Sequence, residues 1–335
     1  MTDLSISIVM PAYNAAHLLP EVLPAALSTA KGSDVLVVDP GSTDDTARIA
    51  EELGARVVRL ARQAGPARAR NAGVACVDSD VVLFIDSDCI AAPDVLDRVR
   101  AAFEADPKLV SLTGSYDDAP SEPGFFSQYM NLRHHITHHR ANREDATFWA
   151  GCGAVRRETF LAVGGFDEAR FPRPQIEDIE LGYRMRAQGS ARLDPALQVR
   201  HMKRWTLGSL IYTDIFERGI PWTQLMLEQG GVPNDLNLRA SQRVAAALAP
   251  LALLCLGLLP VSLIAGTTPT ALAATLLLAA SVGLQLDLLR DFARLRGPWF
   301  ALRAWIFHQI HLSYSCATFG YCWIQHRLRS WKRSP

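Results

Sequence analysis

The sequence has no excess of charge of either sign, because 34 Lys and Arg residues balance 34 Asp and Glu residues among 335. A strongly basic chain would indicate nucleic-acid binding, and this balance gives no reason to expect it. The six cysteines include no C-x-x-C pair, which predicts reduced thiols and argues against a disulfide framework. The first residues, MTDLSISIVM, lack a basic segment followed by an apolar one, so we expect no export signal.

Charged residues are also missing from the stretch between residues 244 and 286, which is almost wholly apolar. As helices, residues 244–265 and 270–289 would be about 33 Å and about 30 Å long, enough to cross a bilayer. We therefore expect a linker at 230–243 and a transmembrane hairpin at 244–289. The alternative is a buried helical pair in a soluble protein. Arginines flank the hairpin and none lies in its turn, which predicts that both flanks, and the chain before them, are cytosolic.

Residues 297–335 are rich in Trp, Tyr and His and end in a basic tail. A third span would place that tail outside, against the tendency of basic residues to stay inside. An amphipathic helix in the cytosolic interface fits better, and a third membrane helix is the alternative. The expected location is the cytoplasmic (inner) membrane, crossed more than once, with the N-terminal region in the cytosol.

The N-terminal third alternates short apolar runs with helical segments. The expected strands are residues 5–10, 34–39, 55–60, 81–86 and 109–116. The expected helices are residues 43–53, 66–76 and 93–105. This rhythm predicts an α/β fold with a mainly parallel central sheet covered by helices on both faces.

After residue 116 the pattern changes to a polar, aromatic and His-rich stretch. A helix is expected over residues 177–189, followed by two short strands at 191–194 and 197–203 and a helix at 206–229. The run NLRHHITHHR pairs His134 with His138 and His135 with His139 at helical spacing. These pairs could bind zinc, but no cysteine or acidic partner is evident nearby, and a polar surface is the better interpretation.

Polar residues gather where the expected strands end, and ligands bind at that edge of a parallel sheet. Asp86 and Asp88 close the strand at 81–86 and, one pleat apart, would project to one side. Two such anions repel one another unless a cation lies between them, and oxygen ligands suit Mg²⁺ or Mn²⁺. The implied ligand is a diphosphate. Alone, the pair also fits a turn or a helix cap.

Two other segments offer groups for a nucleotide. In VVDPGSTDDT, Asp39 ends a strand and could accept N–H bonds from a base or ribose, although the segment also fits a turn and a capped helix. In GPARARNAGV, Arg68, Arg70 and Asn71 could donate to a phosphate or ribose, although a solvated basic helix start is the alternative.

In this order and spacing, these segments resemble glycosyltransferase family 2 over nearly all of residues 5–229. The resemblance rests on SIVMPAYNAA, VVDPGSTDDT, ARARNAG, FIDSD, VGGFDE, EDIELGYR and KRW. It implies a GT-A fold, the nucleotide-diphospho-sugar transferase domain, with a donor-binding half at 1–116 and an acceptor-binding half at 117–229. It also implies a divalent metal on Asp86 and Asp88, a base contact by Asp39, and Asp178 as the catalytic base with Glu177 beside it.

The resemblance leads us to expect a set of donor-binding residues. They are Pro11, Tyr13, Asn14, Asp39, Arg70, Asn71, Asp86, Ser87, Arg204 and Trp205. The chain departs from the family at His201, where a Gln or Arg leads the Arg-Trp motif in processive and lipid-glycosylating members, and at Pro40, where many relatives carry a second Asp. Glu177 and Asp178 would also fit an acidic first turn of a helix.

An acidic base is needed for a hydroxyl acceptor but not for an ionised lipid phosphate, and an apolar hairpin favours an acceptor carried by a lipid. The sequence therefore predicts an inverting transfer from a UDP- or GDP-linked sugar to a lipid-borne hydroxyl. A polyprenyl-phosphate glycosyltransferase and a non-catalytic membrane scaffold are the alternatives. A nucleotidyltransferase would need a Gly-rich phosphate loop after the first strand, where the chain has PAYNAAHLLP.

Overall fold

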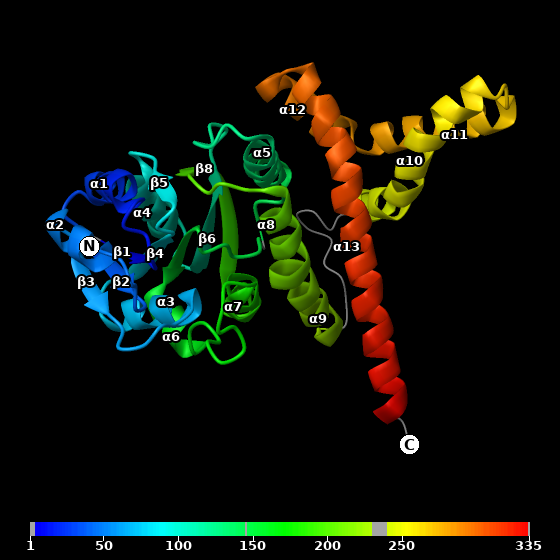
Figure 1. Cartoon of the computed structure of the whole chain (residues 1–335). Coiled ribbons are helices and arrows are strands. Elements are labelled where there is room, and N and C mark those ends of the chain that lie inside the picture. The colour runs from blue at the N-terminus through cyan, green and yellow to red at the C-terminus, as the bar shows by residue number, and fades with distance from the viewer. Residues whose placement is uncertain (1–3, 145, 230–239, 334–335) are drawn as a thin grey trace. The chain divides into compact units, whose positions relative to one another are not determined.

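The computed structural model describes residues 4–144, 146–229 and 240–333 (Figure 1). The chain divides into two compact units, Met1–Arg204 and Trp205–Pro335, and each is described by itself. The expected helix at 206–229 therefore lies with the second unit. Most of the expected linker at 230–243 lies outside the described residues, and helix α10 begins at Ala240.

The described part of the first unit contains an eight-stranded sheet in the order β3-β2-β1-β4-β7-β6-β8-β5. The strands are β1 (Ile6–Pro11), β2 (Val35–Asp39), β3 (Arg56–Arg59), β4 (Val81–Ile85), β5 (Cys89–Ala91), β6 (Leu109–Tyr116), β7 (Cys152–Arg156) and β8 (Ser190–His201). The first four neighbours, β3-β2-β1-β4, are parallel as expected. The rest of the sheet is mixed, because β7 runs antiparallel to both β4 and β6.

Strand β8 replaces the two short strands expected around Pro195. It runs parallel to β6, and the register shifts between the Thr113–Leu193 pair and the Ser115–Gln198 pair. Pro195 lies inside this irregular segment, where a residue without an N–H does not interrupt the ladder. One bent strand therefore carries the chain from α7 to His201.

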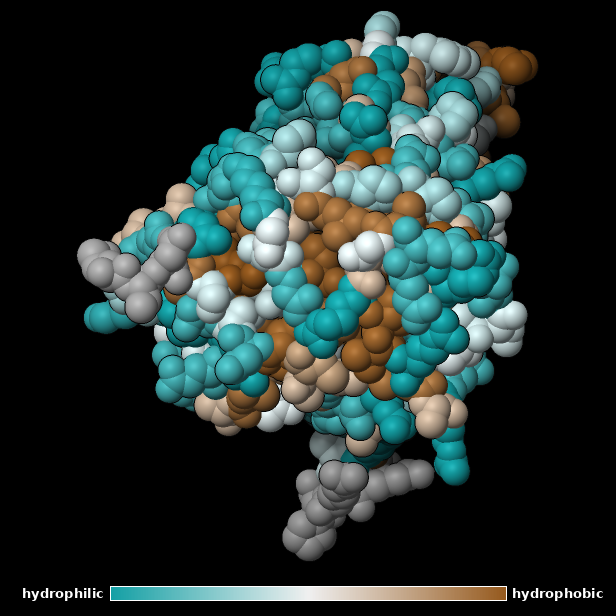
Figure 2. All heavy atoms as spheres, turned by 90° about the vertical axis from the view of Figure 1, so that its left-hand side faces the viewer, coloured by the Kyte–Doolittle hydropathy of each residue, from teal (hydrophilic) through white to brown (hydrophobic). Residues whose placement is uncertain are grey.

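Helices cover both faces of the sheet. They are α1 (Leu19–Ala30), α2 (Thr46–Glu52), α3 (Pro66–Ala75), α4 (Val95–Ala105), α5 (Phe125–Arg140), α6 (Arg157–Ala162) and α7 (Glu177–Arg186). In β4, Leu83 packs into a core with α1 and α4, while Phe84 packs into a second core with α3, α6 and α7. This burial on both faces explains the uninterrupted apolar run in the sequence. Polar side chains cover much of the outer face seen in Figure 2, with apolar residues between them.

The second unit is helical. It contains α8 (Leu207–Tyr212), the π-helix η1 (Thr213–Gly219), α9 (Ile220–Glu228), α10 (Ala240–Ile264), α11 (Thr268–Leu284), α12 (Leu286–Arg296) and α13 (Pro298–Arg333). Among the described residues, α10 is long and apolar enough to cross a membrane by itself. The expected second span is interrupted, because α11 and α12 meet that test only as a pair bent by 70°.

The bend between α11 and α12 falls at Gln285, whose side chain is buried. Gln309 on α13 donates from Nε2 to Gln285 Oε1 at 2.9 Å, and Ser281 donates from Oγ to Gln309 Oε1 at 3.0 Å. These side-chain bonds satisfy polar groups within the helix bundle. α13 is a single helix of 36 residues over the segment expected to lie in the interface or to span the membrane.

Candidate active site

The loops that follow β1 and β2 are hydrogen-bonded to each other at the carboxyl edge of the sheet. Ser42 Oγ accepts a bond from Asn14 N–H at 2.9 Å, and Asn14 Oδ1 accepts one from Thr43 N–H at 2.9 Å. Asn14 has φ of 49°, a left-handed conformation that Asn adopts more readily than most residues. Pro11, the last residue of β1, is half-buried beside this junction.

Asp39 and Tyr13 lie on these two loops. Asp39 is only 5% exposed, and its Oδ1 accepts bonds from Gly41 N–H at 3.1 Å and Ser42 N–H at 2.7 Å. Tyr13 is 41% exposed, and its hydroxyl accepts a bond from Gln63 Nε2 at 2.8 Å. The structure thus brings the ends of β1, β2 and β3 to one edge, as the parallel pairing requires.

Asp86, Ser87 and Asp88 form a turn between β4 and β5, since β4 ends at Ile85. The expectation that Asp86 and Asp88 lie one pleat apart on a strand is therefore wrong. A tight turn frees each carboxylate from the strand's alternation, so the two side chains have different partners. Each carboxylate lies next to a different side chain that is positively charged or can be protonated.

Asp86 is paired with Arg70, which links it to Glu177. Arg70 Nη2 lies 2.6 Å from Asp86 Oδ1, and Nη1 lies 3.0 Å from Glu177 Oε1. The Arg70 and Glu177 side chains are each 6% exposed. Burial raises the pKa of Asp86, the Arg70 charge opposes the rise, and the nearby Asp88 charge adds to it. One guanidinium from α3 therefore holds the turn after β4 and the first turn of α7.

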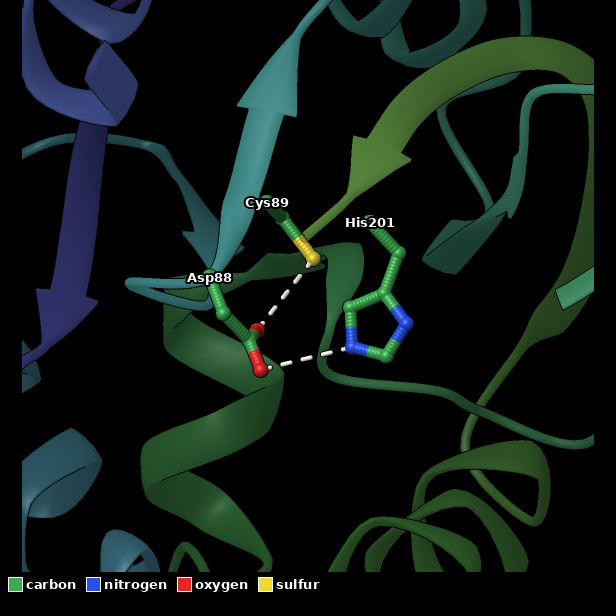
Figure 3. A group of neighbouring side chains, drawn as sticks. All are labelled: Asp88, Cys89 and His201. Atoms are coloured by element: carbon green, nitrogen blue, oxygen red, sulfur yellow. Dashed lines mark hydrogen bonds and ion pairs between the residues drawn. The ribbon is translucent and has the colours of Figure 1, made fainter. Parts of the chain in front are cut away.

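Asp88 is paired with His201, the last residue of β8 (Figure 3). His201 Nε2 lies 3.3 Å from Asp88 Oδ2, and His201 Nδ1 lies 2.6 Å from Asn131 Oδ1. Asn131 Nδ2 donates to Ser127 O at 2.9 Å, which fixes the amide with its oxygen toward the ring. Nδ1 must then carry the proton, so a neutral His201 presents the lone pair of Nε2 to a carboxylate. Two acceptors in contact require a cation between them, either a proton or a metal ion.

The charges around Asp88 favour its ionised form. Burial alone would raise its pKa, but the His201 ring and Lys203 outweigh burial and hold the pKa at about 2. His201 also stacks on Tyr116 with ring centroids 4.4 Å apart, which fixes the plane of the imidazole. In the sequence, His201 was noted only as a departure from the family's Arg-Trp motif. Its position at the end of an expected strand, immediately before KRW, could have identified it as a site residue.

The residues around Asp88 fit a hard divalent cation. Among the described residues, Asp88, Cys89 and His201 form the group whose ligand atoms lie close enough to share a metal ion. Burial and the charges of Asp88 and Asp86 raise the pKa of the Cys89 thiol well above its ordinary value, so the sulfur stays protonated 3.6 Å from Asp88 Oδ1. The donors that remain are a carboxylate oxygen, the ligand type that suits Mg²⁺ and Mn²⁺, and an imidazole nitrogen, which also suits Zn²⁺ and Fe²⁺.

Asp178 lies at the start of α7, next to Glu177. Its carboxylate accepts bonds from Ala150 N–H at 3.2 Å and Ile179 N–H at 2.8 Å. Burial and the Glu177 charge raise its pKa to about 7, although Arg70 and the two N–H groups oppose the rise. A carboxyl poised near neutrality is suited to take a proton at physiological pH.

Three expected donor-binding residues lie apart from the residues around Asp88: Asn71 has partners inside the protein, Arg204 ends the first unit, and Trp205 lies in the other unit. Asn71 binds the Phe166 backbone through both ends of its amide, donating to O and accepting from N–H, each at 2.9 Å. Arg204 is exposed at the end of the first unit. Trp205 belongs to the second unit and is buried there, with the Arg218 guanidinium 5.8 Å from its ring centre.

The histidines of α5 are occupied by structural contacts. A ring nitrogen of His135 lies 2.9 Å from Tyr116 O, and one of His139 lies 2.9 Å from His135 O. Burial lowers the pKa of His138 to about 4, so this ring stays neutral. None of the four falls in the candidate metal-binding group found among the described residues.

The fold and site define a class of protein. A parallel β3-β2-β1-β4 edge, an acidic turn after β4 and a mixed extension that ends in α7 and β8 form a GT-A fold, the domain of nucleotide-sugar transferases. The model of glycosyl transferase family 2 matches residues 7–164. This segment of the chain is a family 2 glycosyltransferase domain.

Curated relatives agree with this assignment. The chain is 29% identical over 230 residues to validoxylamine A glucosyltransferase of Streptomyces hygroscopicus subsp. jinggangensis, covering 55% of this chain and 52% of the relative. It is 34% identical over 106 residues to undecaprenyl-phosphate 4-deoxy-4-formamido-L-arabinose transferase of Klebsiella pneumoniae, covering 29% of this chain and 32% of the relative. The chain spans about half or less of the length of the curated relatives it matches first.

A mannosyltransferase from Pyrobaculum calidifontis, solved in complex with GDP-Man and Mn²⁺, shares the fold. It superimposes with a TM-score of 0.62 at 18% identity, covering 95% of this chain and 87% of the other. At this identity the likeness establishes the fold alone.

Proposed function

We propose that this protein is an inverting, metal-dependent glycosyltransferase. It transfers a sugar from a nucleotide-diphospho-sugar to a lipid-borne hydroxyl at the cytosolic face of a membrane. The observation that carries the proposal is the pairing of Asp88 Oδ2 with His201 Nε2 at 3.3 Å, beside a second carboxylate, Asp86, at the carboxyl edge of the sheet. The match of residues 7–164 to glycosyl transferase family 2 makes the diphosphate of a sugar donor the expected ligand of this metal site.

Asp86, Asp88 and His201 would hold the cation in this proposal. When bound, Mg²⁺ or Mn²⁺ would neutralise charge on the diphosphate leaving group. Arg70 keeps Asp86 in place, and Glu177 in turn balances the buried guanidinium. Glu177 is thus a positioning residue for the metal site, a different role from the one expected beside the base.

Asp178 would act as the general base. The acceptor oxygen attacks the anomeric carbon, its proton passes to the Asp178 carboxylate, and the bond from that carbon to the diphosphate oxygen breaks. The nucleoside diphosphate leaves with the bonding electrons, and the configuration at the anomeric carbon inverts. A positioned base of this kind contributes roughly 10²- to 10⁴-fold in rate.

The donor nucleotide would lie along the loops after β1 and β2. Asp39, Tyr13, Asn14 and Pro11 would surround the base and ribose, and Ser87 would lie beside the diphosphate. Arg204, Trp205 and Asn71 remain predicted donor contacts. The partners of Asn71 inside the protein favour a structural role for that residue.

Helices α10 and α11 would form a hairpin in the membrane. Leu254, Val261 and Ile264 on α10 are more than half exposed, as lipid-facing residues would be. Helix α12 and the exposed Trp299 and Trp323 of α13 would lie in the interface. This arrangement would bring a lipid-borne acceptor to the enzyme.

A second candidate is a polyprenyl-phosphate glycosyltransferase. The similarity to the undecaprenyl-phosphate transferase of Klebsiella pneumoniae favours it. An ionised phosphate acceptor needs no general base, so this candidate gives Asp178 no proton to accept. The effect of Asp178→Asn on each acceptor therefore separates the two.

The full-length protein in detergent should be incubated with UDP- and GDP-sugars, Mn²⁺ and total membrane lipid, and the products analysed by mass spectrometry. We expect a glycosylated lipid that is absent when Mn²⁺ is chelated. A glycosylated polyprenyl phosphate would select the second candidate. Neither donor hydrolysis nor transfer with any donor would contradict the enzymatic function and favour a scaffold.

A further inference from the structure

We propose that helix α13 lies flat on a membrane surface that contains anionic phospholipids, with its exposed apolar side chains in the bilayer and its arginines on the lipid phosphates. The inference rests on the membrane location in the proposed function. It deepens that function in two respects, because it chooses between an interfacial and a spanning orientation of this segment and names the class of lipid that binds it.

One face of α13 is covered by the rest of the second unit. Leu312 packs in a cluster with Ala245 of α10, and the Tyr314 hydroxyl donates to Asp214 Oδ2 of η1 at 2.7 Å. The inner face of α13 therefore packs on its neighbours, as the core-facing side of an ordinary surface helix does.

The opposite face of α13 is exposed and apolar along most of its length, where an ordinary surface helix carries polar side chains. The exposed apolar positions recur every three or four residues, and the half-buried Ser313 and the exposed Ala317 continue the row in its middle. We call this row the apolar stripe. Its large side chains are Leu302, Ile306, Ile310, Tyr321, Ile324 and Leu328. An exposed apolar surface of this extent marks an interaction site.

The charged residues of α13 all have one sign. Its 36 residues include no Asp or Glu, although the whole chain carries 34 charges of each sign. The exposed Arg303 lies near the start of the apolar stripe, and the exposed Arg327 and Arg329 lie at its end. Lys332 and Arg333 follow in the sequence. The occupant of this face must therefore be both apolar and negatively charged, as the surface of an anionic bilayer is.

A second copy of the chain does not match these charges. In a parallel pair of α13 helices packed stripe to stripe, Arg327 would face its own copy. In an antiparallel pair centred on residue 315, Arg327 would lie near Arg303 of the other helix. Neither helix has an acidic residue to pair with these arginines, so like charges would repel in both arrangements.

The length of α13 favours the flat orientation. A straight helix of 36 residues is about 54 Å long, whereas the hydrocarbon core of a bilayer is about 30 Å thick. A spanning helix would also place Arg303 and Arg327 on opposite sides of the membrane, against the tendency of basic residues to stay on one side. A helix parallel to the surface brings both arginines to the headgroups and the apolar stripe to the acyl boundary.

Lipid binding by the full-length protein in detergent tests the inference without any sugar donor. Phosphatidylglycerol and phosphatidylcholine with the same acyl chains are added in equal amounts, and native mass spectrometry counts the molecules of each that stay bound. We expect at least about tenfold more phosphatidylglycerol at about 0.05 M NaCl, since each basic residue near an anionic surface contributes roughly fivefold. Equal retention of both lipids, or of neither, would overturn the inference. A clear preference without any sugar transfer would count against the proposed enzyme alone.

The triple variant Arg303→Gln/Arg327→Gln/Arg329→Gln removes the exposed arginines beside the apolar stripe. Its preference for phosphatidylglycerol should fall to about twofold or less. Circular dichroism shows whether the variant is folded, and a folded variant that keeps the parent's preference overturns the inference. If the variant does not fold, the parent at about 0.5 M NaCl takes its place, because salt screens exposed charges. A preference that persists at that salt concentration also overturns the inference.

The matched control removes three exposed arginines of the first unit. Arg48→Gln/Arg59→Gln/Arg62→Gln makes the same change of charge away from α13 and should keep the parent's lipid preference. Loss of the preference in this control as well would mean that total charge, and not α13, selects the lipid, which overturns the inference.

Ala317→Trp reports the orientation of the helix, because this exposed residue lies near the middle of the apolar stripe. Parent and variant are reconstituted in vesicles of both lipids, brominated either near the headgroup or near the end of the acyl chains. In a flat helix the added tryptophan lies at the acyl boundary, so the shallow bromines should quench its fluorescence at least about twofold more than the deep ones. Stronger quenching by the deep bromines would show a spanning helix and overturn the inference.

Discussion

His201 Nε2 and Asp88 Oδ2 lie 3.3 Å apart although Asn131 fixes the histidine proton on the opposite ring nitrogen. Two residues 113 positions apart in the chain (201 − 88) thus form a pair that either a proton or a metal ion satisfies. The turn after β4 and the end of β8 meet at this point.

His201→Ala should lower the affinity for Mn²⁺ by at least about tenfold, because it removes a ligand and leaves the Asp88 carboxylate without its partner. Isothermal titration with Mn²⁺ alone measures this. His139→Ala, an exposed histidine on α5, is the control and should bind as the parent does. Equal Mn²⁺ affinity of parent and His201→Ala would show that the ion does not contact the ring.

Asp178→Asn should reduce transfer to a hydroxyl acceptor by roughly 10²- to 10⁴-fold, because the amide cannot accept the hydroxyl proton. Donor binding should be nearly unchanged, since Asp178 contacts backbone N–H groups of Ala150 and Ile179. Initial rates and donor calorimetry give the two quantities. Full activity in the folded variant would exclude Asp178 as the base.

The raised pKa of Asp178 predicts how stability depends on pH. A carboxyl with an ordinary pKa of 3.8 and a folded-state pKa of about 7 contributes stability that is complete below about pH 4 and lost as pH rises through 7. An Asn at this position does not titrate. The Tm of Asp178→Asn relative to the parent should therefore rise between pH 5.5 and pH 8.5.

The matched control for this titration is Asp45→Asn. Salt bridging by Arg48 lowers the pKa of Asp45, so its carboxyl stays ionised throughout that pH range. The Tm difference of this variant should be constant. A constant difference for Asp178→Asn as well would mean that Asp178 is ionised in the folded protein at all these pH values.

Arg70→Met should destabilise the first unit by about 3–5 kcal/mol, because it leaves Glu177 and Asp86 as neighbouring carboxylates with no cation. Denaturant unfolding of the full-length protein followed by circular dichroism measures the loss. Arg48→Met removes an exposed arginine with two acidic partners and should change stability far less, because solvent screens exposed ion pairs. Similar losses in both variants would argue against a special role for the buried network.

The sequence indicated β1, β2 and β4 because each is a short apolar run buried on both faces, and it indicated the more exposed β3 by its short run of apolar residues. The pattern did not reveal that β7 enters antiparallel beside β4, since direction within a sheet is set by tertiary pairing. The sequence identified Asp86 and Asp88 as neighbouring site residues. Their side chains were expected to project to the same side because the strand was expected to reach Asp86, whereas β4 ends at Ile85.

Contacts between residues that are far apart in the sequence could not be predicted from the sequence pattern. By its neighbours in sequence, Arg70 fits a solvated helix start, yet it is buried and paired with carboxylates from the turn after β4 and from α7. His201 finds Asn131 only after α5 and β8 pack together. Gln285, at the bend between α11 and α12, likewise pairs with Gln309, a residue 24 positions away.

The shared guanidinium of Arg70 restricts how this domain can be recombined. Anyone transplanting the α7 segment into a relative, to give it another acceptor, moves Glu177 without the arginine that neutralises it. A working chimera therefore has to carry Arg70, Asp86 and Glu177 together.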